Sequence, residues 1–189
     1  MFNRKPNYFY RPRSAKYSNE TMSVNLGVTT DIDGNVSFPS NAPGGPPGIV
    51  VVPATSVLGN RKVKNFTIKI TANGNDDQIF GALVYVPEGT IASSLAVGGA
   101  TQSMYEPNQN VISTFIIPPN VSRNTQGKIT QMSAPTQITV SSRLARNLNT
   151  GDYIALVFST PNGLSAGDGT GDNPEPVVIS GMVNYAIKF

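Results

Sequence analysis

The side chains best suited to chemistry in this sequence stand in its first sixteen positions, where five cations alternate with aromatic rings. The cations are Arg4, Lys5, Arg11, Arg13 and Lys16, and the rings include Tyr8 and Tyr10. Cations neutralise phosphates and aromatic rings stack on bases, so such a segment can bind nucleic acid without reading its sequence. We therefore expect it to contact nucleic acid or another polyanion.

Charge is distributed unevenly along the chain. The segment up to Lys16 carries +5 and no acid precedes Glu20, whereas the rest has nine basic and eleven acidic residues, a balance of −2. Pro6 and Pro12 disfavour a helix in the basic segment. The pattern predicts a mostly flexible basic arm over residues 1–19 and one folded domain over residues 20–189. A disordered terminus with incidental charges is the simpler alternative.

The sequence offers little for catalysis or metal binding. It contains no His and no Cys, which removes the commonest general base, the thiol nucleophile and the thiolate metal ligands. A loop with Asp168, Asp172 and Glu175 lacks the ligand spacing of a calcium-binding loop. We expect no catalytic residues, no metal site and no cofactor.

Two further groups of cations are candidates for binding. Lys62 and Lys64 share one face of a predicted strand, where they could extend a basic strip for nucleic acid or discourage edge-to-edge pairing of sheets. Arg143 and Arg146 stand where a strand gives way to a tight turn. They are candidates for a subunit interface with bidentate hydrogen bonds, or two exposed arginines.

The elements that must position these residues are strands, because segments rich in Val, Ile, Thr, Tyr and Phe alternate with turn clusters. The predicted strands are Met22–Thr30, Ile49–Val52, Arg61–Ala72, Ile79–Val86, Asn110–Ile117, Tyr153–Ser159 and Val177–Lys188. The segments Ile129–Met132 and Thr136–Ser142 form one interrupted strand or two short strands around Pro135, which gives eight or nine strands in total. A short stretch at Val36–Phe38 follows a hairpin turn. The segment Ile79–Val86 is apolar throughout and predicts a strand buried on both faces.

The strand Arg61–Ala72 contains a break in its alternation. Phe66, Ile68 and Ile70 form the apolar set that should point inward. Lys62 and Lys64 share the parity of that set, which predicts a bulge or a strand start near Lys64.

The strand pattern predicts an all-β fold with very little helix, a single eight-stranded jelly-roll sandwich of two antiparallel four-stranded sheets. An immunoglobulin-type sandwich is the alternative, although it usually buries a Trp and this chain has none. Only 13% of residues are charged, and a neutral polar surface permits self-assembly. No apolar run could span a membrane and the start is not a signal peptide, so we expect no membrane partner and synthesis without export.

Three blocks of sequence carry a resemblance to a known family. They are YVPEGT at 85–90, MYEPNQNVIS at 104–113 and SSRLARNLNTGDYIALVF at 141–158. In their order and spacing they resemble the capsid proteins of small circular single-stranded DNA viruses that encode a rolling-circle replication protein, the circovirus-like group. The pattern R-x-x-R-N-L-N-x-G-D in the last block is the most specific part of the resemblance.

The resemblance implies a non-enzymatic jelly roll of which about sixty copies form an icosahedral shell around circular single-stranded DNA. It also implies that the arm faces inward, that the protein resides in the virion, and that assembly can involve the host nucleus. The family's arms typically carry a longer, denser Arg/Lys tract. Sixty arms of +5 supply only about 300 charges, fewer than the phosphates of a small genome. We therefore expect Lys62, Lys64, Lys69 and Lys128 to supplement the arm.

Two alternatives remain from the sequence. A coat protein of a small RNA or satellite virus would share the fold, size and arm, since RNA offers the same phosphates. A carbohydrate-binding sandwich module belongs to another class and would need exposed aromatic residues. The sequence does not identify a host receptor, and exterior contacts are expected in the longer loops at Pro39–Gly48, Gly89–Gly99 and Pro161–Pro176.

Overall fold

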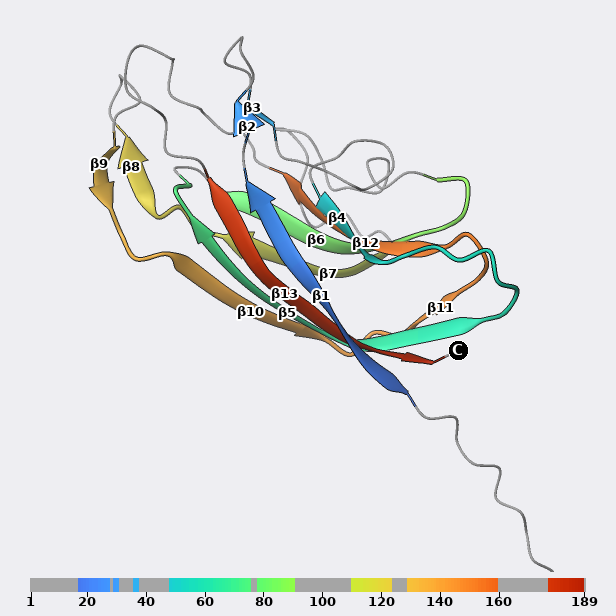
Figure 1. Cartoon of the computed structure of the whole chain (residues 1–189). Helices are drawn as coiled ribbons and strands as arrows, with labels where there is room; N and C mark the ends of the chain where they lie inside the picture. Colours follow the sequence, from blue (N-terminus) through green and yellow to red (C-terminus); the bar gives the residue numbers. More distant parts are fainter. Residues whose placement is uncertain are drawn as a thin grey trace, which may run out of the picture.

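The computed structural model describes residues 17–27, 29–30, 36–37, 48–75, 78–90, 110–123, 129–159 and 177–188 (Figure 1). Within these residues all regular secondary structure is β-strand, and every strand pair is antiparallel. The prediction of an all-β chain is therefore confirmed for the described part.

One sheet contains the first and last long strands of the chain. Its order is β1 (Ser18–Gly27), β13 (Val178–Lys188), β5 (Arg61–Asn73) and β10 (Thr136–Ser142), and β11 (Arg146–Leu148) also pairs with β5. The predicted four-stranded composition is wrong for this sheet, which has five strands. The reason is the length of β5, whose 13 residues accommodate β10 and β11 one after the other along the same edge.

The second sheet has four strands, as predicted. Its order is β4 (Gly48–Val52), β12 (Tyr153–Ser159), β6 (Ile79–Val86) and β7 (Val111–Ile117). Two short ribbons accompany the sheets: β2 (Thr29–Thr30) pairs with β3 (Val36–Ser37), and β8 (Val121–Arg123) pairs with β9 (Ile129–Met132). Figure 1 shows the two sheets as two curved layers.

The core lies between the two sheets. Phe66, Ile68 and Ile70 of β5 point inward as predicted, and they belong to the same buried cluster as Leu83 of β6 and Leu156 of β12. Burial of such side chains contributes about 1.5–3 kcal/mol each to folding. This shared cluster holds the two layers together.

The four-stranded sheet is also apolar on its second face. Ala82, Val84 and Val86 of β6 form a separate buried cluster with Tyr153, Ala155 and Val157 of β12. The prediction that Ile79–Val86 is buried on both faces is therefore confirmed. The two sheets differ in character, because the five-stranded sheet is apolar on its inner face only.

A bulge at Asn65 divides β5 into two halves. The register pairs Thr67 with Asn184 and Lys64 with Ala186, so two residues of β5 face the single residue Tyr185. Asn65 has φ of 57°, the left-handed conformation that Asn tolerates better than most residues. The predicted bulge is confirmed.

The bulge shifts the alternation of β5 by one residue. Before it Arg61 and Val63 are buried, and after it the buried positions continue from Phe66. Without this shift Lys62 and Lys64 would point between the sheets. With it, both lysines lie on the outer face of the five-stranded sheet.

The first strand begins inside the segment predicted as the arm. Ser18 and Asn19 belong to β1, where they pair with Ile187 and Ala186 of β13. The expected boundary after residue 19 thus falls within a strand. Residues 1–16 lie outside the described residues.

Replacing Asn65 tests the bulge. We expect Asn65→Val to lower the free energy of unfolding by about 1–2 kcal/mol, because a β-branched residue is strained at positive φ. Asn65→Gly is the control and should leave stability equal or higher, since Gly adopts this conformation without a Cβ penalty. Urea unfolding of both variants provides the measurement, and equal stability of Val and Gly variants would contradict the bulge geometry.

Candidate nucleic-acid interface

Four lysines lie on the outer face of the five-stranded sheet, which we call the lysine face. They are Lys62, Lys64 and Lys69 on β5, and Lys188 on β13. Lys62 and Lys188 are directly opposite each other in the register. Lys62 and Lys64 are two residues apart, about 6.6 Å along the strand. The two strands therefore bring three of the four cations into one cluster.

The lysine face has no acidic residue among its described positions. Its other outward side chains are Asn, Ser, Thr, Gln, Met, Val and Ala. Glu20, the acid of β1, has the parity of Val24 and Leu26 and lies on the opposite side of the sheet. There its Oε1 accepts a hydrogen bond from Ser18 Oγ at 2.8 Å. The lysine face is thus cationic without neighbouring carboxylates.

This arrangement is unfavourable for the isolated sheet. Like charges directly opposite each other on adjacent strands destabilise a sheet by about 0.2–1 kcal/mol, and Lys62 and Lys188 form such a pair. A bound polyanion would relieve that repulsion and release its own counterions. The lysine face is therefore suited to a polyanionic ligand.

Tyr17 connects the lysine face to the predicted arm. Lys64 Nζ lies 3.9 Å from the centroid of the Tyr17 ring, a cation–π contact. Tyr17 immediately follows Lys16 in sequence, so the basic segment joins the sheet beside the lysine cluster. The other predicted binding residues lie outside the described residues: Arg4, Lys5, Tyr8, Tyr10, Arg11, Arg13 and Lys16.

The structure enlarges the cation set that the sequence suggests. Lys62 and Lys64 share a face, as expected, and Lys69 lies on that same face. Lys128 is outside the described residues. Lys188 and Tyr17 were not recognised from the sequence, because their proximity depends on the pairing of the first and last long strands. Local alternation carries no information about that pairing.

The two arginine candidates have different environments. Arg146 is half-buried, and its guanidinium donates to the carbonyl oxygens of Ala145 at 3.2 Å and Val111 at 3.4 Å. Val111 begins β7, so Arg146 links the edges of the two sheets. Arg143 is exposed. It lies in the three-residue connection between β10 and β11, opposite Lys64 and Asn65 of the bulge. Arg143 therefore remains accessible for contact, whereas Arg146 is engaged within the chain.

Asp152 is the centre of a buried polar cluster beneath the tight turn Asn149–Asp152. Its carboxylate accepts hydrogen bonds from Tyr85 Oη at 2.7 Å, Glu88 N at 3.0 Å and Asn149 N at 2.8 Å. Its backbone oxygen accepts a bond from Arg61 Nη2 at 3.0 Å. The cluster therefore joins β5 of one sheet to β6 and β12 of the other.

The surroundings of Asp152 favour its charged form. Burial by itself raises the pKa of Asp152, but the hydrogen bonds from Tyr85, Asn149 and Glu88 and the charge of Arg61 outweigh burial and lower the pKa. Burial and the bond to Asp152 raise the pKa of Tyr85 to about 12. Burial also lowers the pKa of Arg61, against the attraction of Asp152. A neutral phenol thus donates to a charged carboxylate.

This cluster gives the last sequence block a structural role. The turn depends on Gly151, which has φ of 83° and packs against the Glu88 side chain. Leu148, which ends β11 just before the turn, is fully buried. Sequence reasoning identified the turn but missed Asp152, Tyr85 and Arg61 as a group. The local signal for this group is an Asp that directly follows a Gly in a turn and precedes a buried strand, and it lies in the last sequence block.

The described residues hold no group of three acidic side chains that could bind a metal ion. They also include no helix suited to crossing a membrane. The acidic loop with Asp168, Asp172 and Glu175 lies outside the described residues. Comparison of the chain with protein-family models and with curated proteins found no match.

Replacing Asp152 tests the polar cluster. We expect Asp152→Asn to lower the free energy of unfolding by about 3 kcal/mol at neutral pH, because an amide cannot accept from all the buried donors. Glu88→Gln is the matched control, since the exposed Glu88 contributes its backbone N–H to the cluster. Urea unfolding measures both variants, and equal stability of the two would contradict the assigned role.

The pH dependence provides an independent measurement on the same variants. The folded-state pKa of Asp152 is depressed, so the unfolded chain takes up the proton first as pH falls. The stability from this group is therefore present above about pH 4 and is lost below it, through the depressed pKa. The difference in stability between wild type and Asp152→Asn should shrink over that range.

Proposed function

We propose that this protein is a viral coat protein that assembles into a closed icosahedral shell and holds single-stranded DNA through its basic arm and the lysine face. The observation that carries the proposal is the acid-free lysine face, at whose edge the arm joins the sheet. Its four lysines supply the supplementary cations that a +5 arm requires for binding a genome.

The strand pairing supports a jelly-roll fold. Eight described strands have five or more residues, namely β1, β4, β5, β6, β7, β10, β12 and β13. Numbered in that order, the first pairs with the eighth, the second with the seventh, the third with the sixth and the fourth with the fifth. A long antiparallel hairpin folded over into two sheets has this pairing, which is the jelly-roll arrangement. Many viral coat proteins have this architecture.

The geometry supports binding without sequence specificity. The lysines project from a sheet face as separate flexible cations, and such groups act on phosphates as point charges. Contacts of this kind position a backbone but carry no information about bases. The Tyr17 ring beside Lys64 adds one surface on which a base could stack.

Two alternative functions are an RNA or satellite-virus coat protein and a carbohydrate-binding module, and the described residues support the first better than the second. An RNA or satellite-virus coat protein would use the same cations, and the three sequence blocks favour DNA over it. A carbohydrate-binding module would need exposed aromatic rings that form a sugar platform, whereas every described aromatic side chain is buried or half-buried. We therefore place the coat protein first and the sugar-binding module well behind.

Assembly is the first test. Electron microscopy of the purified protein should show closed shells of uniform size, because a coat protein of this size forms symmetric contacts with its own copies. A chain that stays monomeric at every protein and salt concentration would overturn the proposal. Sensitivity of co-purified nucleic acid to deoxyribonuclease, but not ribonuclease, distinguishes DNA from RNA.

Nucleic-acid binding is the second test. We expect the combined variant Lys62→Gln, Lys64→Gln and Lys188→Gln to weaken binding of a single-stranded DNA oligonucleotide. The slope of log affinity against log salt should decrease by about 2, since each neutralised phosphate contributes about 0.7. Fluorescence anisotropy across a salt series gives the slope.

A matched control substitutes neutral residues on the same face. The variant Thr21→Gln, Ser23→Gln and Thr67→Gln changes side-chain size without removing charge and should preserve the slope. Deletion of residues 1–16 should lower the slope by up to about 3.5 for its five cations. An unchanged slope in the lysine variant would exclude the lysine face from binding.

A further inference from the structure

One aromatic ring lies among the cations of the lysine face. The Tyr17 side chain is half-buried, and Lys64 Nζ lies 3.9 Å from the centroid of its ring. Tyr17 immediately precedes β1, whose first residues pair with the last residues of β13. At that end of the sheet Lys62 and Lys188 are opposite each other. The ring therefore lies at the same end of the sheet as three of the four lysines.

The contact between Tyr17 and Lys64 spans one strand of the sheet. Asn19 of β1 is opposite Ala186 of β13, which is in turn opposite Lys64 of β5. Strands β1 and β5 are therefore two strand spacings apart, about 10 Å. Ala186 points to the outer face but is only 6% exposed, which agrees with larger side chains lying over it. A short side chain at this position leaves room for the ring to reach the lysine.

A ring among cations matches the two parts of a nucleotide. The cations neutralise the phosphate, and the face of the ring stacks on the base, whichever base it is. Only an unpaired base can be splayed out onto such a ring, because the bases of a duplex are stacked on one another. Duplex DNA therefore offers this site phosphates alone, and a polyanion without bases does the same.

We propose that Tyr17 gives the lysine face a preference for single-stranded nucleic acid, because an unpaired base stacks on its ring while neighbouring phosphates contact Lys62, Lys64 and Lys188. A cation–π contact at a partly exposed site is weak, so Lys64 exchanges the ring for a phosphate and uncovers the ring face for the base. This inference rests on the proposed function and names the residue that recognises the bases.

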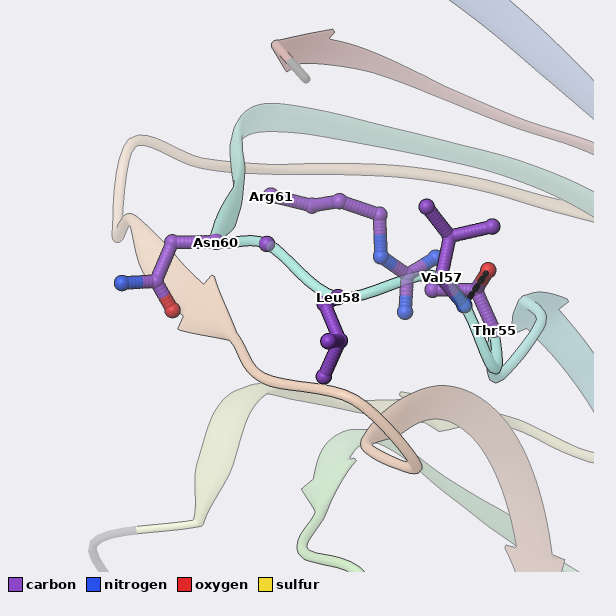
Figure 2. Close-up of a pocket in the computed structure, with 6 residues that line it drawn as sticks. Thr55, Val57, Leu58, Asn60 and Arg61 are labelled. Carbon is purple, nitrogen blue, oxygen red and sulfur yellow. Dashed lines mark hydrogen bonds between the residues drawn. The ribbon is translucent and has the colours of Figure 1, made fainter.

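The hollow beside the connection from β4 to β5 is less suited to a nucleotide. It has a volume of about 200 Å³ and is lined by Thr55, Val57, Leu58, Gly59, Asn60 and Arg61 (Figure 2). Arg61 is the one cation among these lining residues, and its guanidinium already donates to Pro53 O at 2.8 Å and to Asp152 O at 3.0 Å. A phosphate at the hollow would therefore lack the cluster of accessible cations that accompanies Tyr17.

An abasic oligonucleotide separates the two parts of the ligand, because it keeps every phosphate and lacks the bases. By fluorescence anisotropy, the full-length wild-type protein should bind single-stranded DNA at least about tenfold more tightly than an abasic oligonucleotide of the same length. Tyr17→Leu should lower this ratio of affinities about tenfold, which is the order of effect of stacking one base on an aromatic side chain. Tyr17→Phe is the matched control, because it keeps the ring and should preserve the ratio.

Two further measurements separate stacking from a merely structural role of Tyr17. The affinities of Tyr17→Leu for the abasic oligonucleotide and for duplex DNA should equal those of the wild type, because the phosphate contacts persist. Lys64→Gln should lower the salt slope by about 0.7 and preserve the base preference. If Tyr17→Leu weakened binding of intact and abasic oligonucleotides equally, or left both unchanged, the stacking role would be overturned and the proposed function would stand. A wild-type protein that binds neither oligonucleotide would overturn both.

Discussion

The structure depends on keeping a charged carboxylate stable beneath the surface, at Asp152. A buried charge is tolerated only when hydrogen bonds replace the water that it loses, and Asp152 is 3% exposed. Its donors come from Tyr85 in β6, from the backbone after β6 and from the turn before β12, while its own carbonyl receives Arg61 of β5. Any relative displacement of these strands would leave a buried polar group without a partner. Asp152 thus ties the two sheets together at one end of the molecule, because its carboxylate binds Tyr85 of β6 and the turn before β12 while its carbonyl oxygen accepts from Arg61 of β5.

The Asp152 cluster also supports part of the molecular surface. The turn that contains Asn149 supplies one of the donors and also supports the loop that carries Val57 and Leu58. On the outer face of the five-stranded sheet, the lysines would need no such anchoring in the proposed role, because a phosphate backbone is bound by charge and tolerates variable geometry. The chain therefore combines one loop that is held by hydrogen bonds with one cationic face. The cationic face agrees with one task of the proposed coat protein, which is contact with a nucleic acid of arbitrary sequence.

Much of the fold was predictable because it depends on local patterns. Alternation of Phe66, Ile68 and Ile70 indicated the inward face of β5, and the continuous apolar run Ile79–Val86 indicated a strand buried on both faces. The lysine parity even predicted the bulge. Features that depend on distant pairing were not predictable in this way. Lys188 and Tyr17 join the cation cluster only because β1 and β13 are neighbours, and β11 adds a fifth strand only because β5 extends past the end of β10. The Asp152 cluster was missed for the same reason, since Arg61, Tyr85 and Asp152 are far apart in sequence.

The bulge at Asn65 has a consequence for how this strand can change during evolution. The bulge shifts the inward–outward alternation of β5 by one residue. Even-numbered positions before it, 62 and 64, point outward and accept polar residues, whereas even-numbered positions after it, 66 and 68, point inward and require apolar residues. Loss of a single residue at the bulge would exchange the two rows of the first half-strand. Arg61 and Val63 would then face outward, and two lysines would enter the space between the sheets. Insertions and deletions in β5 are therefore expected to survive only in compensating pairs, whereas the fold itself tolerates individual substitutions at the exposed lysine positions.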